Sequence, residues 1–270
     1  MLIDLGGHQA YAYTGGRPFD PALPCIAFMH GALHDHSTWT LPARWFAHHG
    51  YSVLAPDQPG HMRSRGPVCP DVPAIAQWLL QVLDAVGAQD VALVGHSMGS
   101  LIALEAAARA PGRVRRLVMV GTAYPMVVSP ALIEAAELRP EQGIEMVNNF
   151  SISSWASKPG YPGPGFWLHG GNRALMHRVL ASNREVNLFS HDFRLCDEYR
   201  GAEAVMPHVQ ARTHLVLGER DQMTPPRACA SLRQGLRATV QTVAAGHGLM
   251  HEDPEDFLRI LRSIMQAAVA

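Results

Sequence analysis

The sequence has 270 residues, of which 47% are hydrophobic and 17% are charged, and its formal net charge is −1. This composition supports a large buried core and excludes a disordered chain. The near-neutral charge and the lack of a basic stripe argue against nucleic acid or an anionic membrane as a partner. We expect one core domain with an insertion, because single domains usually hold about 100–200 residues.

Several features predict a cytoplasmic protein. The N-terminal stretch MLIDLGGHQAYAYTGG lacks a basic region followed by a long apolar run, so we expect no signal peptide. The sequence has no run of about 18 apolar residues, so we expect no transmembrane helix. The cysteines are far apart and form no CxxC pair, which favours reduced thiols over disulfides or a metal site. They are Cys25, Cys69, Cys196 and Cys229.

Short apolar runs predict the strands. Residues 3–5 and 10–13, on either side of Gly6-Gly7, predict a short hairpin. Later runs are continuous rather than alternating, which is typical of strands buried on both faces of a parallel sheet. These runs are residues 25–29, 52–55, 91–94, 117–120 and 214–217, and a further strand-like segment covers 238–243.

Helical patterns alternate with these runs, at about residues 42–49, 72–86, 98–110, 226–236 and 254–268. The alternation predicts an α/β fold with a mostly parallel central sheet flanked by helices. Residues 124–206 contain no convincing strand and far exceed an ordinary connection in length. Helical patterns near 140–150, 172–182 and 191–199, and a Ser129-Pro130 helix start, predict a helical lid there. The core would comprise 1–123 and 207–270.

The stretch Gly95-His96-Ser97-Met98-Gly99 follows one apolar run and precedes an alanine-rich helix. This strand–turn–helix context is what a G-x-S-x-G nucleophile elbow requires. So sharp a turn strains the backbone of the serine, and small residues two positions away on each side avoid collisions with neighbouring backbone. We therefore interpret Ser97 as a nucleophile rather than as part of a glycine-rich turn.

A serine hydroxyl needs a histidine base and an orienting carboxylate. His247 sits on a loop after the strand-like segment 238–243, and His251 is its rival. Asp221 follows the run 214–217, and Glu219 is the rival acid. In an α/β fold with a G-x-S-x-G elbow the nucleophile, the acid and the histidine follow one another along the chain, and Ser97, Asp221 and His247 have this order.

Acyl transfer also needs N–H donors for the developing oxyanion. The backbone N–H groups of Met98, after the nucleophile, and of Ala32, after the run 25–29, are the candidates. We expect His30 to hold that loop structurally rather than to act in catalysis. His30, His34 and His36 with Asp35 do not have the spacing of a metal site, so we expect no metal and no cofactor.

Together these stretches resemble the α/β-hydrolase superfamily of serine hydrolases over nearly the whole length. Besides GHSMG, the matching stretches are Met29-His30-Gly31, the DQPGHMRS run at 57–64, LGERD at 217–221, and Gly246-His247 with Glu252, Pro254 and Phe257 behind it. The resemblance implies the triad Ser97, Asp221 and His247, an oxyanion hole at Ala32 and Met98, and a cap domain. Met62 departs from the pattern, in which glycine is commoner. A serine nucleophile argues against the related dehalogenases and epoxide hydrolases.

The leading hypothesis is a hydrolase that cleaves small to medium apolar or aromatic carboxylic esters, a small-molecule substrate, through an acyl-enzyme. The same triad would also suit a C–C bond hydrolase, a lactonase, an amidase or a cofactor-free perhydrolase, and the scaffold would suit a ligand sensor. The sequence leaves the oligomeric state open. The aromatics of the lid would fill its own core or, with nearby residues, line an apolar pocket. The predicted pocket residues are Trp39, Met126, Trp155, Phe166, Trp167 and Met250.

Overall fold

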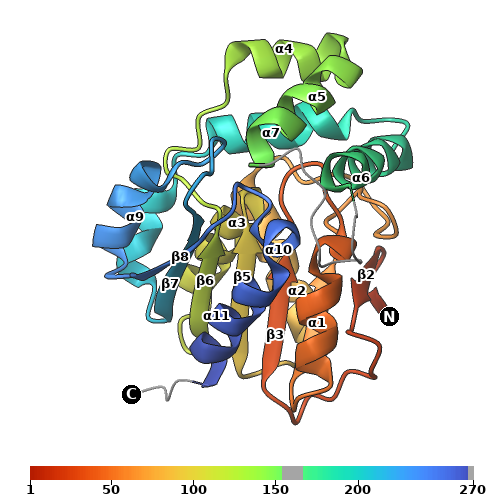
Figure 1. Ribbon diagram of the computed structural model, residues 1–270. Coiled ribbons are helices and arrows are strands. Elements are labelled where there is room, and N and C mark those ends of the chain that lie inside the picture. The colour runs from red at the N-terminus through yellow and green to blue at the C-terminus, as the bar shows by residue number, and fades with distance from the viewer. Residues whose placement is uncertain (154–166, 267–270) are drawn as a thin grey trace.

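A computed structural model describes residues 1–153 and 167–266 (Figure 1). The described residues form an eight-stranded sheet with the order β1-β2-β4-β3-β5-β6-β7-β8. β1 and β2 run antiparallel, and the strands from β3 to β8 are parallel to one another. The strands are β1 (Leu2–Asp4), β2 (Gln9–Tyr13), β3 (Cys25–Met29), β4 (Ser52–Pro56), β5 (Val91–His96), β6 (Val114–Val120), β7 (Arg212–Gly218) and β8 (Thr239–Val243). This is the predicted α/β-hydrolase fold with a mostly parallel sheet.

Helices cover both faces of the sheet (Figure 1). α1 and α11 pack on one face in one hydrophobic cluster, and α2, α3 and α9 pack on the other in a second. These core helices are η1 (His36–Trp39), α1 (Thr40–Ala47), α2 (Val72–Ala85), α3 (Met98–Arg109), η3 (Pro226–Cys229), α9 (Ala230–Gly235), α10 (Leu249–Glu252) and α11 (Pro254–Gln266). β5 lies at the centre of the sheet and all six of its residues are buried, because helices cover it on both sides.

Between β6 and β7 the described residues form helices, and those up to Glu198 lie above the carboxyl ends of the strands at the top of Figure 1. The short helical segments from Ala202 to His208 instead pack against α3 on one face of the sheet. The helices between β6 and β7 are α4 (Pro130–Leu138), α5 (Pro140–Ser151), α6 (Leu168–Ser182), α7 (Leu188–Glu198), α8 (Ala202–Val205) and η2 (Met206–His208). Ser129 caps α4 as predicted, because its side chain accepts from the N–H of Leu132. We call residues 124–206 the lid, and the division into core and lid domains stays a prediction.

The predicted elements match these bounds to within a few residues at most ends. The largest differences are that α6 begins at Leu168 rather than near 172, and that 226–236 divides into η3 and α9. All four cysteines are unpaired thiols. Within 1–153 and 167–266, no helix combines the length and the apolar character needed to cross a membrane. The cytoplasmic location stays a prediction.

Candidate active site

Ser97 lies at the sharp junction between β5 and α3, with φ 53° and ψ −123°. A residue with a side chain rarely adopts this positive φ. The two flanking glycines make the turn sterically feasible. A Cβ on Gly95 would collide with the carbonyl of Gly99, and a Cβ on Gly99 would collide with the carbonyl of Met29. The structure thus confirms the steric reason given for glycine at these two positions.

The strain at Ser97 leads to a stability prediction. Ser97→Gly should be more stable than Ser97→Ala by about 1 kcal/mol, because glycine tolerates the positive φ and this outweighs its greater unfolded-state entropy. Chemical denaturation of the two variants measures the difference. An alanine variant as stable as the glycine variant would mean that the elbow is not strained.

Asp221 and His247 are in direct contact beside this elbow. The loop after β7 carries Asp221 and the loop after β8 carries His247, so adjacent parallel strands bring them together. The Nδ1 of His247 lies 2.8 Å from the Oδ2 of Asp221. With Nδ1–H donating to the carboxylate, the other ring nitrogen, Nε2, is the one able to accept a proton. His247 and Ser97 line the same cavity.

The carboxylate of Asp221 is fully enclosed by donors. Its Oδ1 accepts the backbone N–H groups of Met223, at 2.9 Å, and Thr224, at 2.8 Å. Its Oδ2 accepts the Thr224 hydroxyl at 2.7 Å in addition to His247. Burial acts to raise the pKa of Asp221, but His247 and the Thr224 hydrogen bonds hold it below its usual value. The carboxylate is therefore charged at neutral pH and can stabilise an imidazolium.

His96, the residue before Ser97, orients the candidate base from the other side. Its Nε2–H donates to the backbone carbonyl of His247 at 2.9 Å, and the two ring centroids are 4.6 Å apart. Burial and the nearby histidines hold the pKa of His96 well below its usual value, so the ring is neutral. His96 therefore fixes the His247 loop without adding a positive charge beside it.

The alternative acid, Glu219, and the alternative base, His251, do not contact each other or the proposed pair in the way that Asp221 contacts His247. Glu219 accepts the hydroxyl of Thr242 on the surface, 3.1 Å away, rather than contacting a histidine. His251 lies on α10 and lines the cavity, and burial lowers the pKa of its ring to about 4. Asp221, by contrast, contacts the Nδ1 of His247 directly, so the geometry favours this pair as acid and base.

The two candidate oxyanion donors, the backbone N–H groups of Ala32 and Met98, are free to bind a substrate oxygen. The N–H of Met98 is at the start of α3, whose first N–H groups have no partners within the helix. The N–H of Ala32 follows β3 on a loop that passes against the elbow, where a Cβ on Gly31 would lie 3.1 Å from the Cβ of Ser97. Among the described residues neither N–H donates to a protein acceptor.

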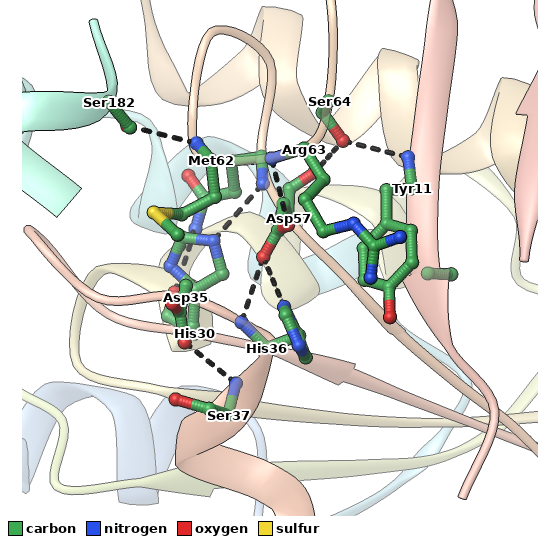
Figure 2. A network of polar contacts seen from close by, with 12 residues as sticks. Tyr11, His30, Asp35, His36, Ser37, Asp57, Met62, Arg63, Ser64 and Ser182 are labelled. Atoms are coloured by element: carbon green, nitrogen blue, oxygen red, sulfur yellow. Dashed lines mark hydrogen bonds and ion pairs between the residues drawn. The ribbon is translucent and has the colours of Figure 1, made fainter. Parts of the chain in front are cut away.

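A polar network holds the loop after β3 against the turn after β4 (Figure 2). Buried Asp57 accepts both the backbone N–H, at 3.0 Å, and the ring Nδ1–H, at 2.7 Å, of His36, and its other oxygen accepts the N–H of Arg63. Ser64 donates its hydroxyl to the carbonyl of Asp57 and accepts the N–H of Tyr11. The DQPGHMRS stretch is therefore the scaffold beneath the candidate site.

His30 and Met62 take their places in the same network. The Nδ1–H of buried His30 donates to the carbonyl of Gly31 at 2.9 Å, and its Nε2 accepts the N–H of Gln58 at 3.1 Å. Burial lowers its pKa to about 4, so His30 is a neutral ring that connects two loops. Met62 has φ 45°, which explains why glycine is the commoner residue there.

The cavity above Ser97 has a volume of about 440 Å³ and is lined mostly by apolar side chains, largely from the lid. Met126 and Met250 line it, as predicted. The prediction for Trp39 is wrong, because that ring is fully buried in the core against Phe28. The prediction for Trp167 is also wrong, because the ring is 53% exposed and lies against Gly170 on its own helix. Trp155 and Phe166 lie outside the described residues.

Sequence reasoning missed several polar residues at the site. Thr224, three residues after Asp221, and His96, inside the pentapeptide, were near recognised residues and could have been noted. Arg178 on α6 lines the cavity and forms an ion pair of 2.7 Å with buried Asp35. This contact joins residues far apart in the chain, so spacing gave no sign of it.

The chain is similar to known hydrolases in sequence and in fold. Residues 24–154 match the family model described as "alpha/beta hydrolase fold". The chain is 27% identical to the sn-1-specific diacylglycerol lipase ABHD11 of Mus musculus, over 91% of this chain and 82% of that protein. An esterase from Exiguobacterium antarcticum superimposes with a TM-score of 0.83 at 17% identity, over 99% of each chain.

The enol-lactonase of Burkholderia xenovorans LB400 superimposes with a TM-score of 0.80 at 17% identity, over 99% of this chain and 100% of that one. At such identities these two structures show a common fold. The matched segment, 24–154, contains the strand, elbow and helix built around Ser97. The chain therefore has the α/β-hydrolase fold, and its residues 24–154 match the model of that family.

Proposed function

We propose that this hydrolase cleaves carboxylic esters of small to medium size, with apolar or aromatic groups, through an acyl-enzyme. The observation that carries the proposal is the 2.8 Å contact between His247 and Asp221 on the apolar cavity that also contains Ser97. A diacylglycerol lipase and an esterase among the similar proteins support the choice of an ester bond.

In the proposed reaction His247 Nε2 takes the proton of the Ser97 hydroxyl while the serine oxygen attacks the ester carbonyl. The N–H groups of Ala32 and Met98 stabilise the oxyanion, and charged Asp221 stabilises the imidazolium. His247 then gives the proton to the leaving alcohol, which leaves an acyl group on Ser97. A water molecule, activated by the same histidine, releases the acid.

The lining of the cavity supports an apolar substrate. Most of the surface that lines the cavity is apolar, which would keep water away from the reacting carbonyl of a bound substrate. A substrate group buried there would gain hydrophobic free energy in proportion to its apolar area, whereas a charged group would lose its hydration. The lid residues concerned are Leu132, Met146, Val147, Leu168, Leu175 and Phe193.

A substrate panel tests the proposal. Purified protein is assayed on p-nitrophenyl esters of increasing acyl length and on lactones, thioesters and anilides, with Ser97→Ala as the blank. We expect the highest kcat/KM on an ester of short to medium chain. Activity confined to lactones would restrict the substrates to cyclic esters, and activity confined to thioesters or anilides would replace the ester by another acyl bond. Activity of the Ser97→Ala protein equal to that of the wild type on every substrate would overturn the proposal.

The size of the cavity leads to a prediction on chain length. Val147 on α5 is buried and lines the cavity. Val147→Phe should lower kcat/KM for a medium-chain ester about 10-fold or more and leave the acetate ester nearly unaffected, since overpacking costs about 1–3 kcal/mol. Val147→Ala should shift the optimum to longer chains. Equal effects on all chain lengths would show that α5 does not bound the acyl site.

A further inference from the structure

A carboxylate from the lid reaches the loop that carries the candidate oxyanion donor. Asp192 lies on α7, and its side chain is 1% exposed. Its Oδ2 accepts the backbone N–H of Leu33 at 2.8 Å and the Nε2–H of His61 at 3.0 Å. Asp192 does not line the cavity, although Phe193 next to it does. It therefore acts on the core rather than on a substrate.

The contact with Leu33 matters because of where Ala32 lies. The two peptide groups that flank Ala32 set the direction of its N–H. In the first, the carbonyl of Gly31 accepts the ring N–H of His30 at 2.9 Å. In the second, the carbonyl of Ala32 accepts the ring N–H of His34 at 2.7 Å, and the N–H of Leu33 donates to Asp192. Of these three hydrogen bonds, the one to Asp192 has its acceptor in the lid.

Leu33 would not hold this conformation by itself. Its φ is 54°, in the left-handed region that costs a residue with a side chain about 1 kcal/mol or more. A hydrogen bond from its N–H to a buried carboxylate offsets this cost, since bonds to charged groups are stronger than neutral ones. Without the acceptor, the peptide between Ala32 and Leu33 would be able to rotate.

Asp192 is itself fixed by His61. The His61 ring contacts the carbonyl of Pro59 through Nδ1 at 3.1 Å and Asp192 through Nε2. Donation from both nitrogens requires the protonated ring. Burial acts to lower the pKa of His61, but Asp192 and the hydrogen bonds raise it above its usual value. The pair therefore joins α7 to the turn after β4, inside the scaffold described above.

We propose that Asp192 is a positioning residue, through which lid helix α7 holds Leu33 so that the N–H of Ala32 points at the developing oxyanion. The inference rests on the proposed ester hydrolysis at Ser97. Catalysis would then depend on the position of the lid, because the Ala32 N–H keeps its direction only while α7 packs against the loop after β3.

Another lid–core contact supplies a matched control. The Ser182 hydroxyl on α6 accepts the N–H of Met62 at 3.0 Å, as Figure 2 shows. This bond ties the lid to the turn after β4 without contacting the loop of Ala32. If Asp192 only attached the lid, its removal and the removal of the Ser182 hydroxyl would have the same kinetic consequences.

The experiment compares Asp192→Ala, Asp192→Asn and Ser182→Ala with the wild type on its best ester. Asp192→Ala should lower kcat about 10–100-fold and change KM by less than about 3-fold, since the oxyanion forms only in the transition state. A trifluoromethyl ketone inhibitor, which forms an oxyanion adduct on serine, should weaken in parallel. Asp192→Asn should keep kcat within about 3-fold, because its amide oxygen can still accept from Leu33. Ser182→Ala should match the wild type.

The outcomes separate the two proposals. A wild type without Ser97-dependent ester turnover overturns the proposed function, and the inference with it. An active wild type whose Asp192→Ala variant keeps its kcat, or an Asp192→Asn variant as slow as Asp192→Ala, overturns the inference alone. Thermal denaturation checks the folding of each variant. If Asp192→Ala does not fold, Asp192→Leu, which is similar in shape and cannot accept, takes its place with the same expectations.

Discussion

Replacing Ser97 with alanine is expected to lower kcat/KM on the best ester by about 10⁴-fold or more. Alanine removes the hydroxyl that His247 would activate and keeps the Cβ at the elbow. The folded structure should persist, because among the described residues no hydrogen bond uses the Ser97 hydroxyl, and its backbone carbonyl still accepts from Ser100. Initial rates and thermal denaturation, measured on the same preparations, test both halves of this expectation.

Mass spectrometry gives a direct view of the acyl-enzyme. Wild-type protein mixed with a slowly deacylating ester should gain the mass of one acyl group on the peptide that contains Ser97, and Ser97→Ala should gain none. Ser231→Ala is the control, because the Ser231 hydroxyl bonds the carbonyl of Tyr124 away from the cavity. An alanine variant that retains more than about 1% of the wild-type rate would show that Ser97 is not the nucleophile.

The central fold could be predicted from the sequence because its strands are buried on both faces. Helix-covered strands must be apolar throughout, so β3 and β5 appear as continuous apolar runs ending in glycine-containing turns. The elbow could also be predicted, because its sharp turn leaves no room for a Cβ at positions 95 and 99 and both residues are therefore glycine. The contact of Asp221 with His247 followed from the pairing of their strands.

The lining of the cavity could not be predicted in the same way. Trp39 is close in sequence to Ala32 and Trp167 belongs to the lid, but the first is fully buried in the core and the second is largely exposed. The residue type indicates that a tryptophan ring favours burial or an interface, but it does not indicate the direction in which the ring points. Direction depends on how η1 and α6 are rotated, which tertiary packing decides.

The polar contacts between the lid and the core could not be predicted from the sequence either. Asp192 and Leu33 are 159 residues apart, and a carboxylate within a helical pattern ordinarily faces solvent. Its burial becomes clear only when α7 is placed over the loop after β3. Thr224 is different, because a threonine three residues after an aspartate in a turn is a local pattern that side-chain capping explains.

Asp221→Asn is expected to lower kcat about 10⁴-fold with little change in KM, because it would place the wrong proton on His247. The N–H groups of Met223 and Thr224 both donate to Oδ1, so the amide of asparagine must present its oxygen to them. Its NH₂ then faces His247 Nδ1 and donates to it. The ring proton moves to Nε2, which can no longer accept from Ser97.

Glu219→Gln is the matched control for this variant, since Glu219 is the neighbouring acid on the same loop and contacts Thr242 instead. It should keep kcat within about 3-fold of the wild type. Equal losses in the two variants would contradict the assignment of Asp221.

The stability of the same variant should depend on pH in a defined direction. The folded pKa of Asp221 is below its usual value, so the carboxylate contributes stability above its unfolded pKa of about 3.9. This contribution is lost as the pH falls through the lower folded pKa. The wild type should therefore be more stable than Asp221→Asn at about pH 7, and the gap should narrow below about pH 4. Denaturation at several pH values measures the gap, and a gap that widened in acid would mean that Asp221 is not held as the anion.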